Sequence, residues 1–154
     1  MEGISLQERF APRSTCYGCG PANEFGLRIR SFATHDAVIA DWRARPHHEA
    51  YPGALNGGVI GTLLDCHMNW TAAYHLMRRD ALERPPATAT AEYSVRMWRP
   101  TPTDAPLRIF GRVVKAGAER AIVEGRLEAG GVVCATSRGT FVAVKPDHPA
   151  YHRW

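Results

Sequence analysis

The sequence predicts an α+β domain in which one long central helix is wrapped by a curved antiparallel β-sheet of about five or six strands. Two observations predict this fold class. Gly57 to about Arg79 carry apolar side chains at the three- and four-residue spacing of a helix. The second half of the chain alternates apolar and polar residues and is interrupted by short glycine-containing turns, as in a meander of hairpins. A single, mostly apolar helix needs a curved sheet around it to bury its surface.

The elements are expected in the order two strands, the helix, then four strands. Six segments have strand character: Leu27–Ala33, Ala37–Ala44, Thr88–Trp98, Leu107–Lys115, Ala121–Glu128 and Val132–Val144. Residues 16–26 and 45–56 are rich in glycine, proline and asparagine, which is typical of loops. Strict alternation along the third strand places Thr90 on one face and Tyr93 and Val95 on the other.

We predict one domain, residues 16–145, preceded by a loosely held N-terminal arm, residues 1–15, and followed by a C-terminal tail on the surface, residues 146–154. A chain of 154 residues can bury enough surface to fold without a disulfide or a metal ion. No run approaches the roughly 18 apolar residues that a membrane span needs. We therefore expect a cytoplasmic protein with neither a signal peptide nor a membrane anchor.

The formal net charge is +4, and the positive charge gathers in the second half of the chain, almost all of it on arginine. Because arginine binds phosphate groups well, this pattern would suit a phosphorylated small molecule or a nucleic acid. A general preference for arginine in the composition explains the same pattern. No cluster of basic residues with interleaved aromatic residues is present, so we expect no nucleic-acid partner.

The four cysteines are Cys16, Cys19, Cys66 and Cys134. Cys16 and Cys19 have the spacing of half a zinc site, but the sequence offers no second pair. We therefore expect both to be small residues in a tight loop, with no metal ion bound.

Asp65 is the residue most strongly indicated for chemistry, because it follows two leucines well inside the helix. A carboxylate removed from water costs several kcal/mol unless it is paired or hydrogen bonded, so proteins keep one for an ion pair, a metal or catalysis. Its position alone leaves a structural ion pair with an arginine of the sheet equally acceptable. The helix face around it is made of small or polar residues: Gly58, Gly61, Thr62, Asp65, Asn69 and Ala72. His67, on the opposite apolar face, is expected to be a core histidine.

The first turn of the helix adds a second feature. Asn56 is a residue type that caps helices, and it precedes Gly57 and Gly58. The first backbone N–H groups of a helix have no intrahelical partner, and glycine leaves them open to a ligand. With the helix dipole, they can polarise a carbonyl or hold an oxyanion. A donor of this kind and a carboxylate on one helix face are a plausible arrangement for acyl transfer.

Four segments together resemble one family. The segment Gly53–Asp65 contains Gly-Gly, six further residues and then an acidic residue, as the family does. The segment Cys16–Leu27 is similar to the family's CFGCG-P-N-x-x-GL opening. Two further segments, Thr90–Pro100 and Gly139–Val144, resemble two of the family's strands. The family is the hot-dog-fold acyl-CoA thioesterases of the PaaI-like (phenylacetate-degradation) type, and the resemblance spans about residues 16–145. It implies a hot-dog fold and hydrolysis of an acyl-CoA thioester to a free acid and coenzyme A, without a cofactor.

The resemblance also implies roles for individual residues. The Gly58 N–H would polarise the thioester carbonyl, Asp65 would be the nucleophile or the base that activates water, and Thr90 would help to hold that water. Asn56 stands where the family usually has histidine. Asparagine can cap the helix and donate a hydrogen bond, but it cannot be protonated.

Five further residues are expected at the substrate site: Gly57, Thr62, Asn69, Trp98 and Arg99. Asn69, one turn beyond Asp65, either orients the carboxylate or crosses a subunit interface. Arg99 would reach a phosphate of coenzyme A, although a solvated surface arginine is the simpler interpretation.

The family is dimeric, often tetrameric, with the helix start and the carboxylate of each active site supplied by different subunits. The resemblance therefore implies a homodimer or a homotetramer. Two alternatives to the thioesterase remain open. One is a non-catalytic acyl-CoA-binding protein, which the asparagine at position 56 motivates. The other is a hot-dog enoyl-CoA hydratase, whose usual Asp/His pair is not found in this sequence.

Overall fold

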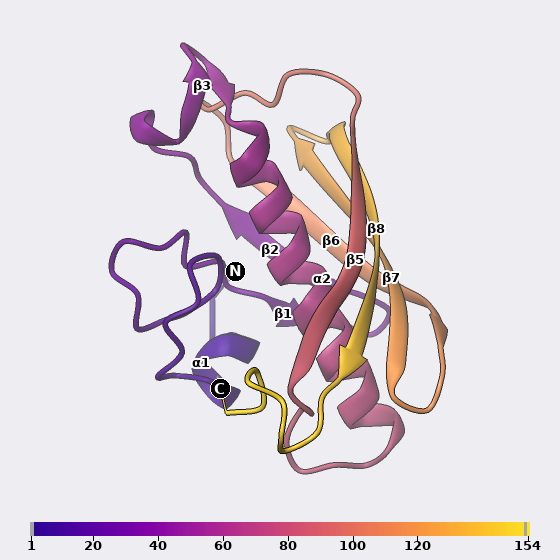
Figure 1. The fold of residues 1–154 in the computed structure, drawn as a ribbon. Helices are drawn as coiled ribbons and strands as arrows, with labels where there is room; N and C mark the ends of the chain where they lie inside the picture. The colour runs from indigo at the N-terminus through magenta and orange to yellow at the C-terminus, as the bar shows by residue number, and fades with distance from the viewer. Residues whose placement is uncertain (1, 153) are drawn as a thin grey trace.

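The computed structural model describes residues 2–152 and 154, and it contains one long helix packed against a curved antiparallel sheet (Figure 1). The helix, α2 (Gly57–Arg79), packs on the four long strands that the second half of the chain forms. This arrangement confirms the predicted fold class. No helix in the described part of the chain is long and apolar enough to cross a membrane.

Six strands form the main sheet in the order β1-β2-β6-β7-β8-β5, with every neighbouring pair antiparallel. The strands are β1 (Phe32–Ala33), β2 (Val38–Trp42), β5 (Thr88–Met97), β6 (Leu107–Ala116), β7 (Arg120–Ala129) and β8 (Val132–Ala143). β5 therefore lies at one edge of the sheet, and the short β1 lies at the other. The four strands that follow the helix lie where the sequence predicts them, to within a few residues.

The segment before the helix differs from its predictions in two places. The expected strand Leu27–Ala33 is reduced to β1, because Arg28 has a positive φ of 52° and the N–H groups of Leu27 and Ile29 bond to the preceding loop. The expected loop 45–56 contains a 3-10 turn, η1 (Pro46–His48), and a small hairpin of β3 (Glu49–Tyr51) and β4 (Ala54–Leu55). Pairs this short carry too little periodicity to be recognised in a sequence.

Two glycines let α2 lie close to the sheet. A Cβ at Gly111 on β6 would overlap Thr71 of α2, and a Cβ at Gly125 on β7 would lie 3.0 Å from the sulfur of Met68. Both positions are where the helix presses on the middle of the sheet, so a larger residue would push the two layers apart.

The N-terminal segment, expected to be loosely held, is instead packed into the fold through α1 (Leu6–Phe10). Gln7 Nε2 donates to Ser31 Oγ (2.9 Å), Ser31 Oγ lies 2.9 Å from His67 Nδ1, and His67 Nε2 lies 2.9 Å from the Val38 carbonyl oxygen. Burial lowers the pKa of His67 to about 4, so the ring is neutral. His67 is thus the core histidine that the sequence predicts, and it joins α1 to α2 and β2.

The tail, residues 146–154, is exposed over most of its described length, but its end is not a free surface extension. The Trp154 ring stacks on Trp70 of α2, with ring centroids 4.4 Å apart. Figure 1 shows this end of the chain beside α1. Both ends of the chain therefore cover the second half of α2.

Candidate functional site

Asp65 lies near the middle of α2 and accepts a hydrogen bond from Thr90 of β5, with 2.7 Å between Thr90 Oγ1 and Asp65 Oδ1. Both side chains are half-buried. The sequence pointed to these two residues separately, and the fold brings them into contact. A hydroxyl that donates to a carboxylate oxygen fixes the orientation of the carboxylate.

Tyr93, which the sequence did not indicate, belongs to the same group. A Cβ at Gly61 would lie 3.2 Å from the Tyr93 hydroxyl, so the absence of a side chain at Gly61 makes room for the phenol beside the helix. Burial raises the pKa of Tyr93, and the negative charge of Asp65 raises it further. Tyr93 is therefore a neutral hydroxyl close to Asp65 and able to donate a hydrogen bond.

A bulge in β5 explains why strict alternation placed Tyr93 on the wrong face. The register between β5 and β8 shifts between Thr90, which pairs with Phe141, and Glu92, which pairs with Thr140. One extra residue in a strand reverses the alternation beyond it. Tyr93 therefore lies on the same face of the sheet as Thr90, towards α2.

The start of α2 confirms the predicted helix cap and shows where the cap bonds. Asn56 Oδ1 accepts from the Gly58 N–H at 2.8 Å and from the Val59 N–H at 3.3 Å. Seven residues of helix separate Gly58 from Asp65, which is a rise of about 10 Å. The two groups are therefore about two turns of helix apart on one chain.

Two more of the expected substrate residues have partners inside the chain. Thr62 Oγ1 donates to the Gly58 carbonyl oxygen at 2.9 Å. Asn69 is buried, its Nδ2 donates to the Thr88 carbonyl oxygen at 3.4 Å, and its Oδ1 accepts from the Thr88 hydroxyl. These contacts give Asn69 a structural role between α2 and β5.

Trp98 and Arg99 lie at the far end of β5 from Thr90. Eight residues of strand correspond to about 26 Å. This end of the strand is next to the start of α2, since a Cβ at Gly57 would lie 3.6 Å from the terminal methyl of Met97. Trp98 is half exposed, its Nε1 donates to Thr136 Oγ1 at 2.8 Å, and the Arg96 guanidinium lies 4.3 Å from its ring centroid.

The predicted site residues thus divide into two groups on one chain. The first surrounds the carboxylate: Asp65 and Thr90, to which the structure adds Tyr93. The second surrounds the helix start: Asn56, Gly57, Gly58, Trp98 and Arg99. The structure does not bring the two groups together within a single chain.

Cys66, adjacent to Asp65, supplies the third thiol that the sequence could not assign to Cys16 and Cys19. The three sulfur atoms lie within 4.8 Å of one another. Among the described residues, this is the group of side chains able to hold a metal ion.

No family model matches the sequence, and no curated protein sequence matches it at a significant level. Solved structures do match the fold. A thioesterase superfamily protein from Shewanella loihica PV-4 is 26% identical, with a TM-score of 0.68 over 86% of this chain and 96% of that one. The PaaI protein of the E. coli phenylacetic acid degradation operon is 12% identical, with a TM-score of 0.64 over 77% and 81%.

A hypothetical thioesterase from Streptococcus pneumoniae TIGR4, solved with coenzyme A, is 16% identical, with a TM-score of 0.64 over 75% and 85% of the two chains. The chain described here has the hot-dog fold of these thioesterase superfamily proteins, which confirms the fold and the resemblance that the sequence indicates.

Proposed function

We propose that this protein hydrolyses an acyl-CoA thioester to a free acid and coenzyme A. The observation that carries the proposal is the Asp65 carboxylate, half-buried in the middle of α2 and oriented by the Thr90 hydroxyl. Partial burial of a carboxylate is unfavourable, so its presence at this position in the helix favours a functional role. The bound coenzyme A in one structural neighbour supports a ligand of this class.

Asp65 acts in this proposal as the general base. It takes a proton from a water molecule, and the resulting hydroxide attacks the thioester carbon. The tetrahedral intermediate collapses by breaking the carbon–sulfur bond, and the coenzyme A thiolate leaves and takes up a proton. Thr90 holds the carboxylate, and the neutral Tyr93 hydroxyl is placed to donate a hydrogen bond to the water or the substrate.

Direct attack by Asp65 is the other route, and it would form a mixed anhydride with the acyl group. Rapid-quench mass spectrometry of the intact protein during turnover separates the two. We expect no mass increase equal to the acyl group. An acyl adduct on Asp65 would instead identify the carboxylate as the nucleophile.

We further propose that the working site is shared between two copies of the chain. The rise of about 10 Å between Gly58 and Asp65 favours an arrangement in which the helix start of one copy meets the carboxylate of another. The edge strand β5 supports this, because Tyr93, Met97 and Trp98 leave 41%, 48% and 52% of their surface exposed along it. Trp98 and Arg99 would then contact the coenzyme A portion. Light scattering should report a dimer or a tetramer, and a monomer with full activity would contradict this part.

The direct test is a panel of acyl-CoA substrates with a thiol-release readout, run on the wild-type protein and on Asp65→Asn. We expect release above the level of the variant for at least one acyl group. A panel in which the two proteins give equal rates would refute the proposed hydrolysis. A cytoplasmic location is part of the same proposal, because four free cysteines suit a reducing compartment.

One observation favours a second function, binding of acyl-CoA without turnover. The Gly58 N–H, expected to polarise the carbonyl, already donates to Asn56 Oδ1. Unless a bound carbonyl displaces that oxygen, the helix start contributes less to catalysis. Calorimetric binding of acyl-CoA with no thiol release would support this second function.

A further inference from the structure

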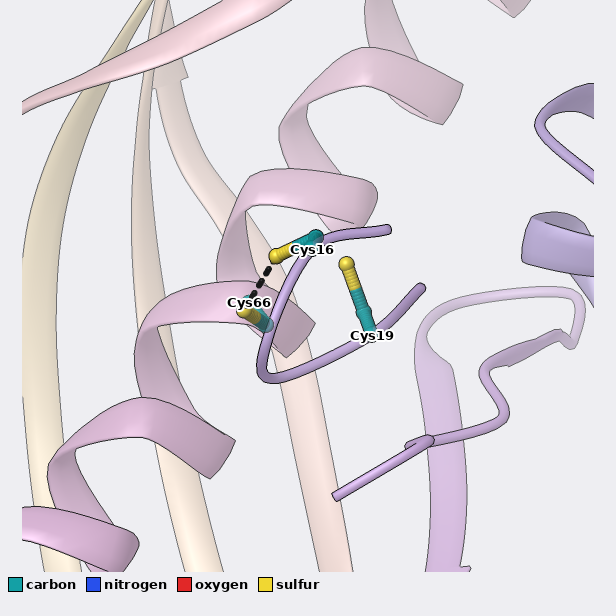
Figure 2. A group of neighbouring side chains, drawn as sticks. All are labelled: Cys16, Cys19 and Cys66. Atoms are coloured by element: carbon teal, nitrogen blue, oxygen red, sulfur yellow. Dashed lines mark hydrogen bonds between the residues drawn. The ribbon is translucent and has the colours of Figure 1, made fainter. Parts of the chain in front are cut away.

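We propose that Cys16, Cys19 and Cys66 form a binding site for a thiophilic metal ion, with Zn²⁺ as the ion to test. Two of the thiols come from the loop at residues 16–20, and the third comes from α2 (Figure 2). In Figure 2 the sulfur atoms of Cys16 and Cys66 face each other, and that of Cys19 points towards the same space. Cysteine thiolates are common ligands of Zn²⁺ in proteins, above all in structural zinc sites.

The distances between the sulfur atoms fit such an ion. Zinc–sulfur bonds of about 2.3 Å in a tetrahedral site place two sulfur atoms about 3.8 Å apart. The Sγ atoms of Cys16 and Cys66 are 3.8 Å apart, and all three lie within 4.8 Å of one another. An ion would therefore need only a small movement of Cys19 to bind all three.

Two glycines hold the loop in the position that brings the thiols together. A Cβ at Gly18 would overlap the Cys66 sulfur and would lie 2.8 Å from Thr62 Cγ2, so only glycine lets the loop lie directly on α2. A Cβ at Gly20 would overlap the backbone of Cys16 and would lie 2.5 Å from the Ser14 carbonyl oxygen, and the Gly20 N–H closes the turn on the Cys16 carbonyl oxygen at 2.8 Å. Glycine at positions 18 and 20 thus allows the loop to bring the sulfur atoms of Cys16 and Cys19 close to that of Cys66.

Hydrogen-bond donors surround the sulfur atoms, as a thiolate requires. Trp70 Nε1 donates to Cys19 Sγ at 3.3 Å. The backbone N–H groups of Cys19 and Gly18 also donate hydrogen bonds to the Cys16 sulfur. Donors to the sulfur atoms stabilise the deprotonated form that binds metal.

Zn²⁺ would bind with loss of the thiol protons to water, so that three zinc–sulfur bonds replace three sulfur–hydrogen bonds. Cys19 and Cys66 are buried, while Cys16 is half-buried. The ion would enter beside Cys16, and a water molecule would complete its coordination there. The bound ion would tie the loop to α2 at the residue next to Asp65, and so would hold one wall of the proposed active site.

The test is a titration of the reduced, chelator-treated full-length protein with Co²⁺, followed by displacement with Zn²⁺. We expect one ion per chain, with the near-ultraviolet absorption of thiolate-to-cobalt charge transfer. Cys16→Ser should weaken Zn²⁺ binding by at least about 100-fold, since loss of a direct ligand exceeds the 10- to 100-fold effect of losing a group that only orients one. The matched control is Cys134→Ser on β8, another buried cysteine outside the group, and it should bind like the wild type.

A second measurement on the wild-type protein keeps the proposal testable if Cys16→Ser does not fold. Zn²⁺ should protect Cys16, Cys19 and Cys66 from alkylation, as read by mass spectrometry, and should leave the labelling of Cys134 unchanged. A reduced protein that takes up no Co²⁺, equal uptake after Cys16→Ser, or equal labelling of the three thiols with and without Zn²⁺ would each overturn the proposal. So would a protein in which Cys16 and Cys66 are found only as a disulfide under reducing purification.

Discussion

Helix α2 makes two similar polar contacts with β5, one turn apart, and the two differ in charge and burial. Asp65 accepts from the Thr90 hydroxyl, and Asn69 accepts from the Thr88 hydroxyl. Asp65 and Thr90 are half-buried, whereas 6% of Asn69 and none of Thr88 is exposed. The same pair of elements therefore presents a carboxylate where solvent or a ligand can reach it, and an amide where neither can.

The difference separates the two halves of the helix by role. Beyond the middle of the helix, the neutral amide of Asn69 satisfies its hydrogen bonds at little electrostatic cost, and the nearby Trp70 and His67 are covered by the two ends of the chain. In the other half, small residues and a charged carboxylate are kept although they bury little apolar surface. We infer that the first half of α2 is arranged for the site and the second for stability.

Replacement of Asp65 by asparagine gives the largest expected effect. Asp65→Asn keeps the shape of the side chain and its acceptor for the Thr90 hydroxyl, but it removes the base. We expect kcat for acyl-CoA hydrolysis to fall by at least about 100-fold, the scale for loss of a general base. Steady-state kinetics with thiol detection measures it.

The matched check for Asp65→Asn is its melting temperature, which should stay within a few degrees of the wild type. Equal losses of activity and stability would show that Asp65 serves the fold and not the chemistry.

The reverse substitution in the buried half, Asn69→Asp, should affect stability instead. A carboxylate in that position has no room for hydration, and we expect a loss of about 2–4 kcal/mol in the free energy of unfolding at neutral pH. Burial would raise the pKa of the new carboxyl above its unfolded value of about 3.9. The variant should therefore approach the wild type below about pH 4 and lose stability as pH rises. Urea denaturation across this range tests it, and a variant of wild-type stability at pH 7 would contradict the division of the helix.

The two threonines offer a test in which only the position on β5 changes. Thr88→Val leaves Asn69 without its buried donor, so we expect a loss of about 1–3 kcal/mol in stability and no change in kcat. Thr90→Val removes the donor that orients Asp65, so we expect kcat to fall at least about tenfold. The loss of stability should be smaller than for Thr88→Val, because water can replace the lost donor at the half-buried carboxylate. Urea denaturation measures the stability of both variants, and steady-state kinetics measures their kcat. The same effects in both variants would contradict the comparison.

The sequence predicted the helix and the four strands after it, and it indicated Asp65, because long periodic segments and a charge inside an apolar run are local signals. Thr90 was indicated only by the resemblance to the thioesterase family, and its contact with Asp65 came from the structure. The sequence missed Tyr93, because a bulge between Thr90 and Glu92 depends on pairing with β8 and leaves no mark in the alternation itself. It also missed the relation of Cys66 to Cys16 and Cys19. Fifty residues separate Cys16 from Cys66, and only the packing of the loop on α2 joins them.

The packing of α1 could not be predicted for a similar reason. Residues 5–11 have too few apolar positions to indicate burial, but Gln7 is bonded to Ser31, which lies 24 residues further along the chain. A buried polar network of this kind depends on the final positions of its members and not on periodicity.

The smallest expected effect is a change in stability at α1, which helps to cover the half of α2 that we assign to stability. Hydrogen bonds from the Ser5 backbone N–H and hydroxyl, with the nearby Arg30 guanidinium, lower the pKa of Glu8 from 4.5 to about 2. Because the folded pKa is the lower one, the contribution of Glu8 is present above pH 4.5 and is lost as pH falls towards 2. Glu8 and Arg30 are largely exposed and screened by solvent, so Glu8→Gln should lower stability by less than about 1 kcal/mol at pH 7, with no difference near pH 2. Urea midpoints at the two pH values measure this, and kcat should not change. A fall in kcat would show that α1 influences the Asp65 carboxylate through His67. That result would contradict the assignment of the two halves of α2 to the site and to stability.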